Sequence, residues 1–303
     1  MSKKQLKNAD YMINQFCKKH QQQMSYSTRH SMSARLKTIY RDLDQLGCNK
    51  LPHLKNIKQK HIEQLVEHWK KSGLSAGTIK NRMANIRFVC DVYGRSTVVK
   101  SNDDLGIERR SYIPTENKAV NELTLDNIND ERLRMSLELQ QQFGLRREEC
   151  LKIKPLQAYR ETDANTHYLK LQASWTKGGI ERIIPITTPE QLKTIKKAMD
   201  LVGKESMIPK NMTYIERRNQ YDDLTHRAGM KNLHGLRHAY AQRRYIELTN
   251  YHTKGNGWRS PIDGGPKRNE LTPEQKRIDK MVREVISYDL GHSREAIVKN
   301  YIG

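Results

Sequence analysis

Leu290-Gly291-His292-Ser293, followed by Tyr301 at the ninth residue after the histidine, is the most informative stretch of this chain. Two stretches upstream carry related side chains, His234-Gly235-Leu236-Arg237-His238 and Gly144-Leu145-Arg146-Arg147-Glu148-Glu149. A guanidinium group stays charged at any working pH and can bind two phosphate oxygens at once. A phenol acts as a nucleophile when charged and proton-transferring groups surround it. A tyrosine among two arginines and several histidines therefore predicts attack of a phenol oxygen on a DNA phosphodiester.

The charge of the chain indicates a polyanionic partner. Its 303 residues include 55 lysines and arginines against 34 acidic residues, a net charge of +21, and the isoelectric point is near 9.8. This balance favours double-stranded DNA over a neutral metabolite. The N-terminus leads into no apolar core of a signal peptide, and no run approaches the ~18 apolar residues of a membrane span. We therefore expect a cytoplasmic, nucleoid-associated protein with no membrane partner.

The cysteine and histidine spacings favour neither a disulfide framework nor a metal site. The four cysteines lack the CxxC spacing of zinc ligands and are predicted to be reduced and mostly buried. His234 and His238 stand four residues apart on an expected helix, which resembles half of a zinc site, but the His-Glu-x-x-His motif is absent. The chain also lacks the phosphate-binding motif GxxxxGK[ST]. We expect no metal and no other cofactor.

Residues 1–107 are predicted to form a helical, core-type DNA-binding domain. Apolar residues recur there every three to four positions in polar surroundings, which is typical of amphipathic helices. Three such stripes are Leu36, Ile39, Leu43 and Leu46; Ile62, Leu65, Val66 and Trp69; and Ile79, Met83, Ile86, Cys90 and Tyr93. Candidate N-caps are Ser25 or Thr28 and Ser75 or Thr78, and candidate C-caps are Gly47 and Gly94. Through residue 110 there are 22 basic and 9 acidic residues, a local charge of +13, so this unit is a candidate DNA clamp.

A polar run at 96–115 shows neither the helical nor the strand periodicity of apolar residues and is predicted to be a linker. We place the domain boundary near residue 108. Residues 108–303 are expected to form an α+β catalytic domain, so the protein should be mainly α with a small β-sheet. Helices are predicted within 123–142 and over 189–202, 211–228 and 234–248. Strands are predicted where Tyr168, Lys170 and Gln172 alternate with apolar residues and at Ile183-Ile184-Pro185-Ile186, with a hairpin turn at Thr176-Lys177-Gly178-Gly179 between them.

The stretch 250–271 is rich in glycine, proline and charge and is predicted to be an inserted loop. It either contacts DNA through residues such as Lys254 and Arg259 or is a tolerated insertion, which we favour. Thr272-Pro273-Glu274-Gln275 then predicts the start of a helix that runs to Gly291. Tyr240, Tyr245 and Tyr288 are expected to pack along helices.

These motifs resemble the tyrosine recombinase (phage integrase) family at four separated places in the correct order. Gly144-Leu145-Arg146 with Glu149 is similar to the first-arginine box, His234 to Arg237 to the His-x-x-Arg box, and Leu290-Gly291-His292 with Tyr301 to the terminal box. Lys177 in its turn is similar to the hairpin lysine. The N-terminal helical unit is similar to the core-binding domain only in kind.

The resemblance implies a role for each residue. Tyr301 would attack the scissile phosphorus and form a 3′-phosphotyrosyl link. Arg146 and Arg237 would hold the non-bridging phosphate oxygens, whose charge grows in the transition state. Lys177 would protonate the leaving 5′ oxygen, with Lys170 and Lys204 as alternatives. His234 and His292 would be donors to the phosphate or proton partners of Tyr301. Glu149 and His238 would orient the catalytic side chains.

The chain departs from the family pattern in three ways. Arg237 and Tyr301 lie 64 residues apart, a longer spacing than is usual, and the excess coincides with 250–271. Only Ile302 and Gly303 follow the tyrosine, so cyclic exchange of a C-terminal helix between protomers is in doubt, and the inserted loop is a candidate replacement. Phe143 stands where a small hydroxyl residue is commoner, which should affect packing more than chemistry.

We therefore predict a site-specific DNA recombinase or integrase that catalyses integration or excision of a mobile element. The resemblance implies a homotetramer on two DNA sites with a specific crossover sequence, a Holliday junction intermediate and, as further partners, accessory DNA-bending proteins. Two alternatives remain open. One is a type IB topoisomerase-like nicking and closing enzyme, which uses the same chemistry without a partner duplex. The other is a catalytically inactive, architectural DNA-binding protein.

Overall fold

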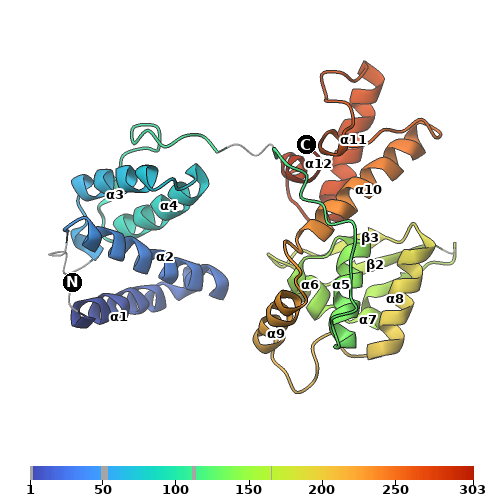
Figure 1. Cartoon of the computed structure of the whole chain (residues 1–303), viewed down its shortest axis with the longest axis horizontal. Coiled ribbons are helices and arrows are strands. Elements are labelled where there is room, and N and C mark those ends of the chain that lie inside the picture. The colour runs from blue at the N-terminus through green and yellow to red at the C-terminus, as the bar shows by residue number, and fades with distance from the viewer. Residues whose placement is uncertain (1–2, 49–53, 111–113, 165) are drawn as a thin grey trace. The chain divides into compact units, whose positions relative to one another are not determined.

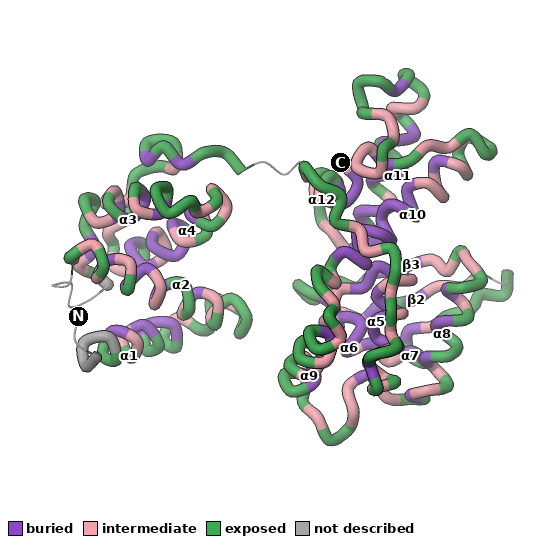
Figure 2. The backbone as a smooth tube through the Cα atoms, viewed as in Figure 1, coloured by how far each residue is buried: buried purple, intermediate pink, exposed green. Residues whose placement is uncertain are grey.

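The computed structural model describes residues 3–48, 54–110, 114–164 and 166–303. By its internal contacts the chain divides into two units, Met1–Ser111 and Tyr112–Gly303 (Figure 1). Each unit has its own buried core (Figure 2). The predicted fold class is confirmed, because helices dominate both units and the strands of the described residues form one three-stranded sheet in the second. Within the described ranges, no helix combines the length and apolar character that crossing a membrane requires.

The first unit is a core of four described helices, and the predicted apolar stripes account for the last three of them. Its helices are α1 (Lys3–Lys19), α2 (Tyr26–Gln45), α3 (Gln59–Lys71) and α4 (Ala76–Val92), with short 3₁₀ turns η1 (Gln21–Gln23), η2 (Leu54–Asn56) and η3 (Ser96–Val98). The side chains of Ser25 and Ser75, rather than those of Thr28 and Thr78, cap α2 and α4. Gly47 and Gly94 adopt positive φ after α2 and α4, as predicted.

The prediction that residues 96–115 form a linker is partly wrong. Leu105 and Ile107 are buried in the core of the first unit, and the backbone at 101–107 is folded by turns. Two isolated apolar residues produce no periodicity, so the sequence pattern could not reveal that they anchor this stretch. Part of the predicted linker, residues 111–113, lies outside the described residues.

The second unit combines helices with an antiparallel sheet of order β1-β2-β3. The strands are β1 (Tyr159–Glu161), β2 (His167–Leu171) and β3 (Arg182–Pro185). Leu169 pairs with Ile184, so the predicted hairpin between β2 and β3 is present, whereas β1 was not predicted. Gln172 lies beyond β2, because the chain turns there into the 3₁₀ turn η4 (Ala173–Trp175).

The predicted helical stretches of this unit are present except near residue 125, whereas three short helices, at 147–152, 155–158 and 299–302, were not predicted. The helices are α5 (Glu131–Phe143), α6 (Arg147–Lys152), α7 (Pro155–Ala158), α8 (Pro189–Val202), α9 (Tyr214–Arg227), α10 (Gly235–His252), α11 (Pro273–Asp289) and α12 (Lys299–Ile302), with 3₁₀ turns η5 (Pro261–Asp263) and η6 (Glu295–Val298). Residues 123–130 are not helical, because the helix begins after Asp130, whose side chain caps α5 by accepting a hydrogen bond from the backbone N–H of Leu133. The predicted capping box of Thr272 and Gln275 opens α11.

Helix α10 is the central support of the candidate site, since it packs against α5, α11 and α12. Tyr240 and Tyr245 are buried along it as predicted. The same prediction for Tyr288 is wrong, because 55% of that residue is exposed. The buried stripe of α11 follows Ile278, Val282 and Ile286, and Tyr288 falls on the opposite face.

Candidate active site

Arg237 lies at the centre of the candidate site and is fully buried on α10. Its guanidinium donates to the backbone oxygens of Gly144 and Leu290, so one side chain joins two of the sequence motifs. It also lies 3.3 Å from Nε2 of His292, and its Nε donates to the Tyr301 hydroxyl at 3.4 Å. Burial lowers the pKa of Arg237 to about 10, which leaves the group charged at neutral pH.

Gly144 allows this close packing between motifs. Its φ is +59°, a conformation that costs glycine little. A Cβ at this position would lie 2.5 Å from the ring of Tyr240, so no larger residue fits. The Gly144 carbonyl can therefore reach Arg237, while the next turn begins α6 at Arg147 and places Arg146 at the N-cap.

Arg146 is the second guanidinium of the site and is oriented from two sides. Its Nη1 donates to Oε1 of Glu149 at 2.8 Å, and its Nη2 donates to the Gly291 carbonyl at 3.1 Å. The backbone N–H of Arg146 donates to Oε2 of Glu149 at 2.7 Å. The Arg146 side chain is 20% exposed, which leaves part of it open to a ligand.

Tyr301 lies on α12 with three histidine rings around its own. The ring centroids are 4.6 Å away for His238, 5.5 Å for His292 and 5.9 Å for His234. The Tyr301 hydroxyl lies 3.4 Å from Nε2 of His234, and either group could be the donor. The structure thus brings together the phenol, both arginines and the predicted histidines.

Lys177 is the predicted residue that does not join this cluster. It lies on the exposed turn between η4 and β3, which is closed by a hydrogen bond from the Thr176 hydroxyl to the Ile180 carbonyl. Its amine has no hydrogen bond or ion pair with any residue that the structure describes. Reaching a phosphate at the cluster would require the turn to move or the DNA to approach it.

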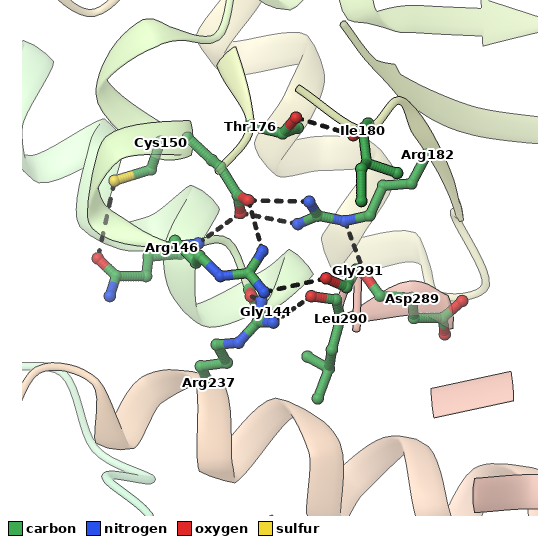
Figure 3. A network of polar contacts seen from close by, with 12 residues as sticks. Gly144, Arg146, Cys150, Thr176, Ile180, Arg182, Arg237, Asp289, Leu290 and Gly291 are labelled. Carbon is green, nitrogen blue, oxygen red and sulfur yellow. Dashed lines mark hydrogen bonds and ion pairs between the residues drawn. The ribbon is translucent and has the colours of Figure 1, made fainter. Parts of the chain in front are cut away.

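Arg182 is a residue of the site that the sequence reasoning missed. It is buried at the start of β3, and its guanidinium donates to both carboxylate oxygens of Glu149 at 2.8 and 2.7 Å (Figure 3). Its Nε donates to the Asp289 carbonyl at 3.0 Å. Figure 3 shows Arg146 and Arg182 reaching toward one carboxylate, with Arg237 near the Gly144 and Leu290 carbonyls. The signal was present, since the two-residue period of a strand places Arg182 on the same buried face as Ile184.

Glu149 is fully buried and shared by two arginines. Burial alone would raise its pKa, but the contacts with Arg182 and the nearby charges of Arg146 and Arg237 outweigh burial and lower it to about 2. The carboxylate is therefore ionised at any physiological pH and holds Arg146 in place. Among the described parts of the chain, no three His, Cys, Asp or Glu side chains converge in a way that suits a metal ion.

The histidines of the site are neutral in the free protein at neutral pH. Burial, and then the charges of Arg237, Arg146 and Arg182, lower the pKa of His292 to about 3. Burial and the charges of Arg237 and Arg146 also lower the pKa of His234. Burial, with His234 as the next cause, lowers the pKa of His238 to about 4.

We predict that an anion in this site raises the pKa of His292. A sulfate ion between Arg146 and Arg237 would offset their charge and stabilise the imidazolium form. The check is an NMR titration of the histidine ring nitrogens with and without sulfate, in which the His292 midpoint should move to higher pH while the signal of the exposed His252 is unmoved by the anion. Identical His292 curves would contradict an anion site here.

Comparison with known proteins agrees with this geometry. Residues 11–99 match a family model described as phage integrase, N-terminal, and residues 107–243 match one described as integrase. The chain therefore belongs to the tyrosine recombinase (phage integrase) family, whose members are enzymes that cleave and rejoin DNA. The second model ends at residue 243, before His292 and Tyr301. No protein of curated function matches the sequence.

Solved structures share the fold at low sequence identity. The XerH site-specific recombinase bound to difH substrate is 16% identical, with a TM-score of 0.55 over 97% of this chain and 81% of that one. The Tn1549 transposon integrase in complex with circular intermediate DNA is 13% identical, with a TM-score of 0.51 over 96% and 95%. A lambda integrase in a tetramer bound to a Holliday junction is 14% identical, with a TM-score of 0.52 over 92% and 72%.

Proposed function

We propose that Tyr301 is the nucleophile of a site-specific DNA recombination reaction. The phenol oxygen forms a bond to the scissile phosphorus while the bond from phosphorus to the 5′ oxygen breaks, which leaves a 3′-phosphotyrosyl link. Neutral His234 accepts the phenol proton, and Lys177 supplies a proton to the leaving 5′ oxygen. The observation that supports this proposal most is the position of the Tyr301 hydroxyl, 3.4 Å from both Arg237 Nε and His234 Nε2.

The arginines supply the electrostatic part of catalysis in this proposal. Negative charge accumulates on the non-bridging oxygens in the transition state, and donors held in place before the reaction stabilise it most. Arg237 is held by two backbone carbonyls, and Arg146 by Glu149 and the Gly291 carbonyl. Glu149 acts through Arg146 as a positioning residue. His238 does so through the rings of His234 and Tyr301.

The biological reaction we propose is integration and excision of a mobile element. Four protomers on two crossover sites exchange strands pairwise through a Holliday junction, with accessory DNA-bending proteins and a nucleoid location as further expectations. Two comparisons support the tetramer, the junction and the mobile element, since the lambda integrase was solved as a tetramer on a Holliday junction and the Tn1549 transposon integrase with circular intermediate DNA. The local charge of +13 through residue 110 supports a role for the first unit in gripping the duplex. The proposed domains are 1–107 for DNA binding and 108–303 for catalysis.

The test is a nicked suicide substrate that carries the crossover sequence, followed by mapping of the labelled peptide. We expect covalent DNA on the peptide that contains Tyr301. Joined molecules from two marked sites would indicate a recombinase, whereas relaxed circles alone would indicate a topoisomerase-like enzyme. Binding without any covalent product would support the architectural alternative.

Lys177→Ala is predicted to slow DNA cleavage by about a hundredfold, a usual contribution of a general acid. The lost function is protonation of the 5′ oxygen, so a substrate with sulfur at that bridging position, which leaves without a proton, should restore the rate. Single-turnover cleavage of the two substrates measures this. Lys170→Ala and Lys204→Ala are the matched controls and should leave both rates unchanged. A Lys177→Ala defect that the sulfur substrate does not relieve would remove Lys177 from the acid role.

A further inference from the structure

The segment that carries Tyr301 has little structure of its own to hold it. Helix α12 spans four residues, Lys299–Ile302, and follows the 3₁₀ turn η6. So short a helix cannot be stable by itself, because forming its first turn costs more backbone entropy than its few hydrogen bonds return. Contacts from other elements must therefore determine where the phenol lies.

Two buried side chains hold the backbone oxygens of this segment. Gln242 on α10 donates from Nε2 to the backbone oxygen of Tyr301 at 3.1 Å. Its side-chain amide also exchanges two hydrogen bonds with the side-chain amide of Asn117. Arg283 on α11 donates from Nη1 to the Gly303 oxygen at 2.8 Å. These anchors act on either side of Ile302, which is fully buried in the core.

The stretch 250–271 provides a surface under the same segment. Its 3₁₀ turn η5 (Pro261–Asp263) packs against α12. A Cβ on Gly303 would lie 3.0 Å from the Ile262 nitrogen and 3.1 Å from the Pro261 Cβ, so the two backbones are already close. Pro261 and Ile262 form this surface, the η5 shelf.

The η5 shelf is tied to α10 and α11 by a folded connection. The Thr249 hydroxyl donates to the Trp258 carbonyl at 3.1 Å, and the Trp258 indole donates to the Tyr245 hydroxyl at 3.0 Å. That hydroxyl donates to Asp279 at 2.6 Å, and Asp279 also accepts from Nε of Arg283 at 2.8 Å. One hydrogen-bonded network thus links the inserted stretch to the arginine that holds Gly303.

We propose that the 250–271 stretch is a docking platform for the nucleophile segment, with Arg283, Gln242 and the η5 shelf as the parts that position Tyr301. The inference rests on the proposed role of Tyr301. The stretch then has a structural task and is more than the tolerated insertion that its composition favoured. Arg283 and Gln242 are positioning residues, because they touch the main chain of the segment rather than the phenol.

The test compares Arg283→Met and Arg283→Lys with Arg277→Met, an exposed arginine of the same helix, as the matched control. Single-turnover formation of covalent DNA is measured over a range of nicked oligonucleotide concentrations, and hydrogen exchange is followed in the peptide 295–303. We expect Arg283→Met to lower the maximal rate by about ten- to a hundredfold, since a small misplacement of a reacting group has effects of this size. The half-saturating DNA concentration should not change, exchange in 295–303 should become faster, and Arg283→Lys should recover part of the rate.

Ile262→Asp decides the question if Arg283→Met fails to fold. Ile262 is half-buried on a surface turn, so its substitution should weaken the η5 shelf without unfolding the unit. An unchanged maximal rate and unchanged exchange in 295–303 for the folded variants would overturn the platform. If the unaltered protein forms no covalent DNA while exchange in 295–303 still responds to Ile262→Asp, the platform stands as a structural device and the proposed role of Tyr301 fails instead.

Discussion

Replacing Tyr301 by phenylalanine should abolish covalent attachment to DNA while leaving DNA binding intact. The substitution removes one oxygen atom. The ring can keep its contacts with the three histidines, and Ile302 can stay buried. Loss of a nucleophile typically costs at least about a thousandfold in rate, because the remaining groups have no bond to form. Denaturing gels of a nicked, end-labelled substrate measure the covalent product, and a mobility shift measures binding.

Tyr288→Phe is the matched control for this prediction. Tyr288 lies on α11 near the same motif but is 55% exposed, so the Tyr288→Phe variant should cleave DNA at the unaltered rate. Covalent product retained by Tyr301→Phe would transfer the nucleophile to another residue. Binding lost together with cleavage would instead assign Tyr301 a structural task.

Much of the fold could be predicted because the amphipathic stripes are regular. The stripe of Ile79, Met83, Ile86 and Cys90 is buried in α4, and the capping box of Thr272 and Gln275 opens α11. Local chemistry determines such features, and nearby residues reveal it. Leu105 and Ile107 show the limit, because their burial depends on a core made by distant helices.

The candidate site could likewise be predicted only in part from the sequence. Resemblance at separated motifs selected Arg146, His234, Arg237, His292 and Tyr301 together, although no local pattern says that residues so far apart converge. Arg182 belongs to none of those motifs. The strand period places it on a buried face, but its pairing with Glu149 is seen only in the folded structure. The hydrogen bond from Arg283 to Gly303 likewise depends on how α11 and α12 pack, which sequence spacing does not specify.

Arg182→Met should destabilise the second unit by about 3–5 kcal/mol, the usual cost of leaving one partner of a buried ion pair without the other. Glu149 would remain buried with Arg146 as its remaining close guanidinium. Hydrogen exchange of the α6 and β3 amides in increasing urea measures this loss for the unit itself. Arg277→Met, which breaks an exposed pair with Glu274, should change stability by less than about 1 kcal/mol.

The pH dependence of the stability of the Glu149→Gln variant separates what the charge of Glu149 contributes from what its packing contributes. The pKa of Glu149 is about 2 in the folded protein against 4.5 for an unperturbed glutamate, so its ionisation favours folding. By linkage this contribution, about 3 kcal/mol, is fully present above pH 4.5 and is lost as the pH falls toward 2. Glu149→Gln should therefore be much less stable than the unaltered protein at pH 7, and the difference should shrink as the solution is acidified. A difference that stays constant between pH 7 and pH 3 would mean that packing, rather than the ion pairs with Arg182 and Arg146, is what Glu149 contributes.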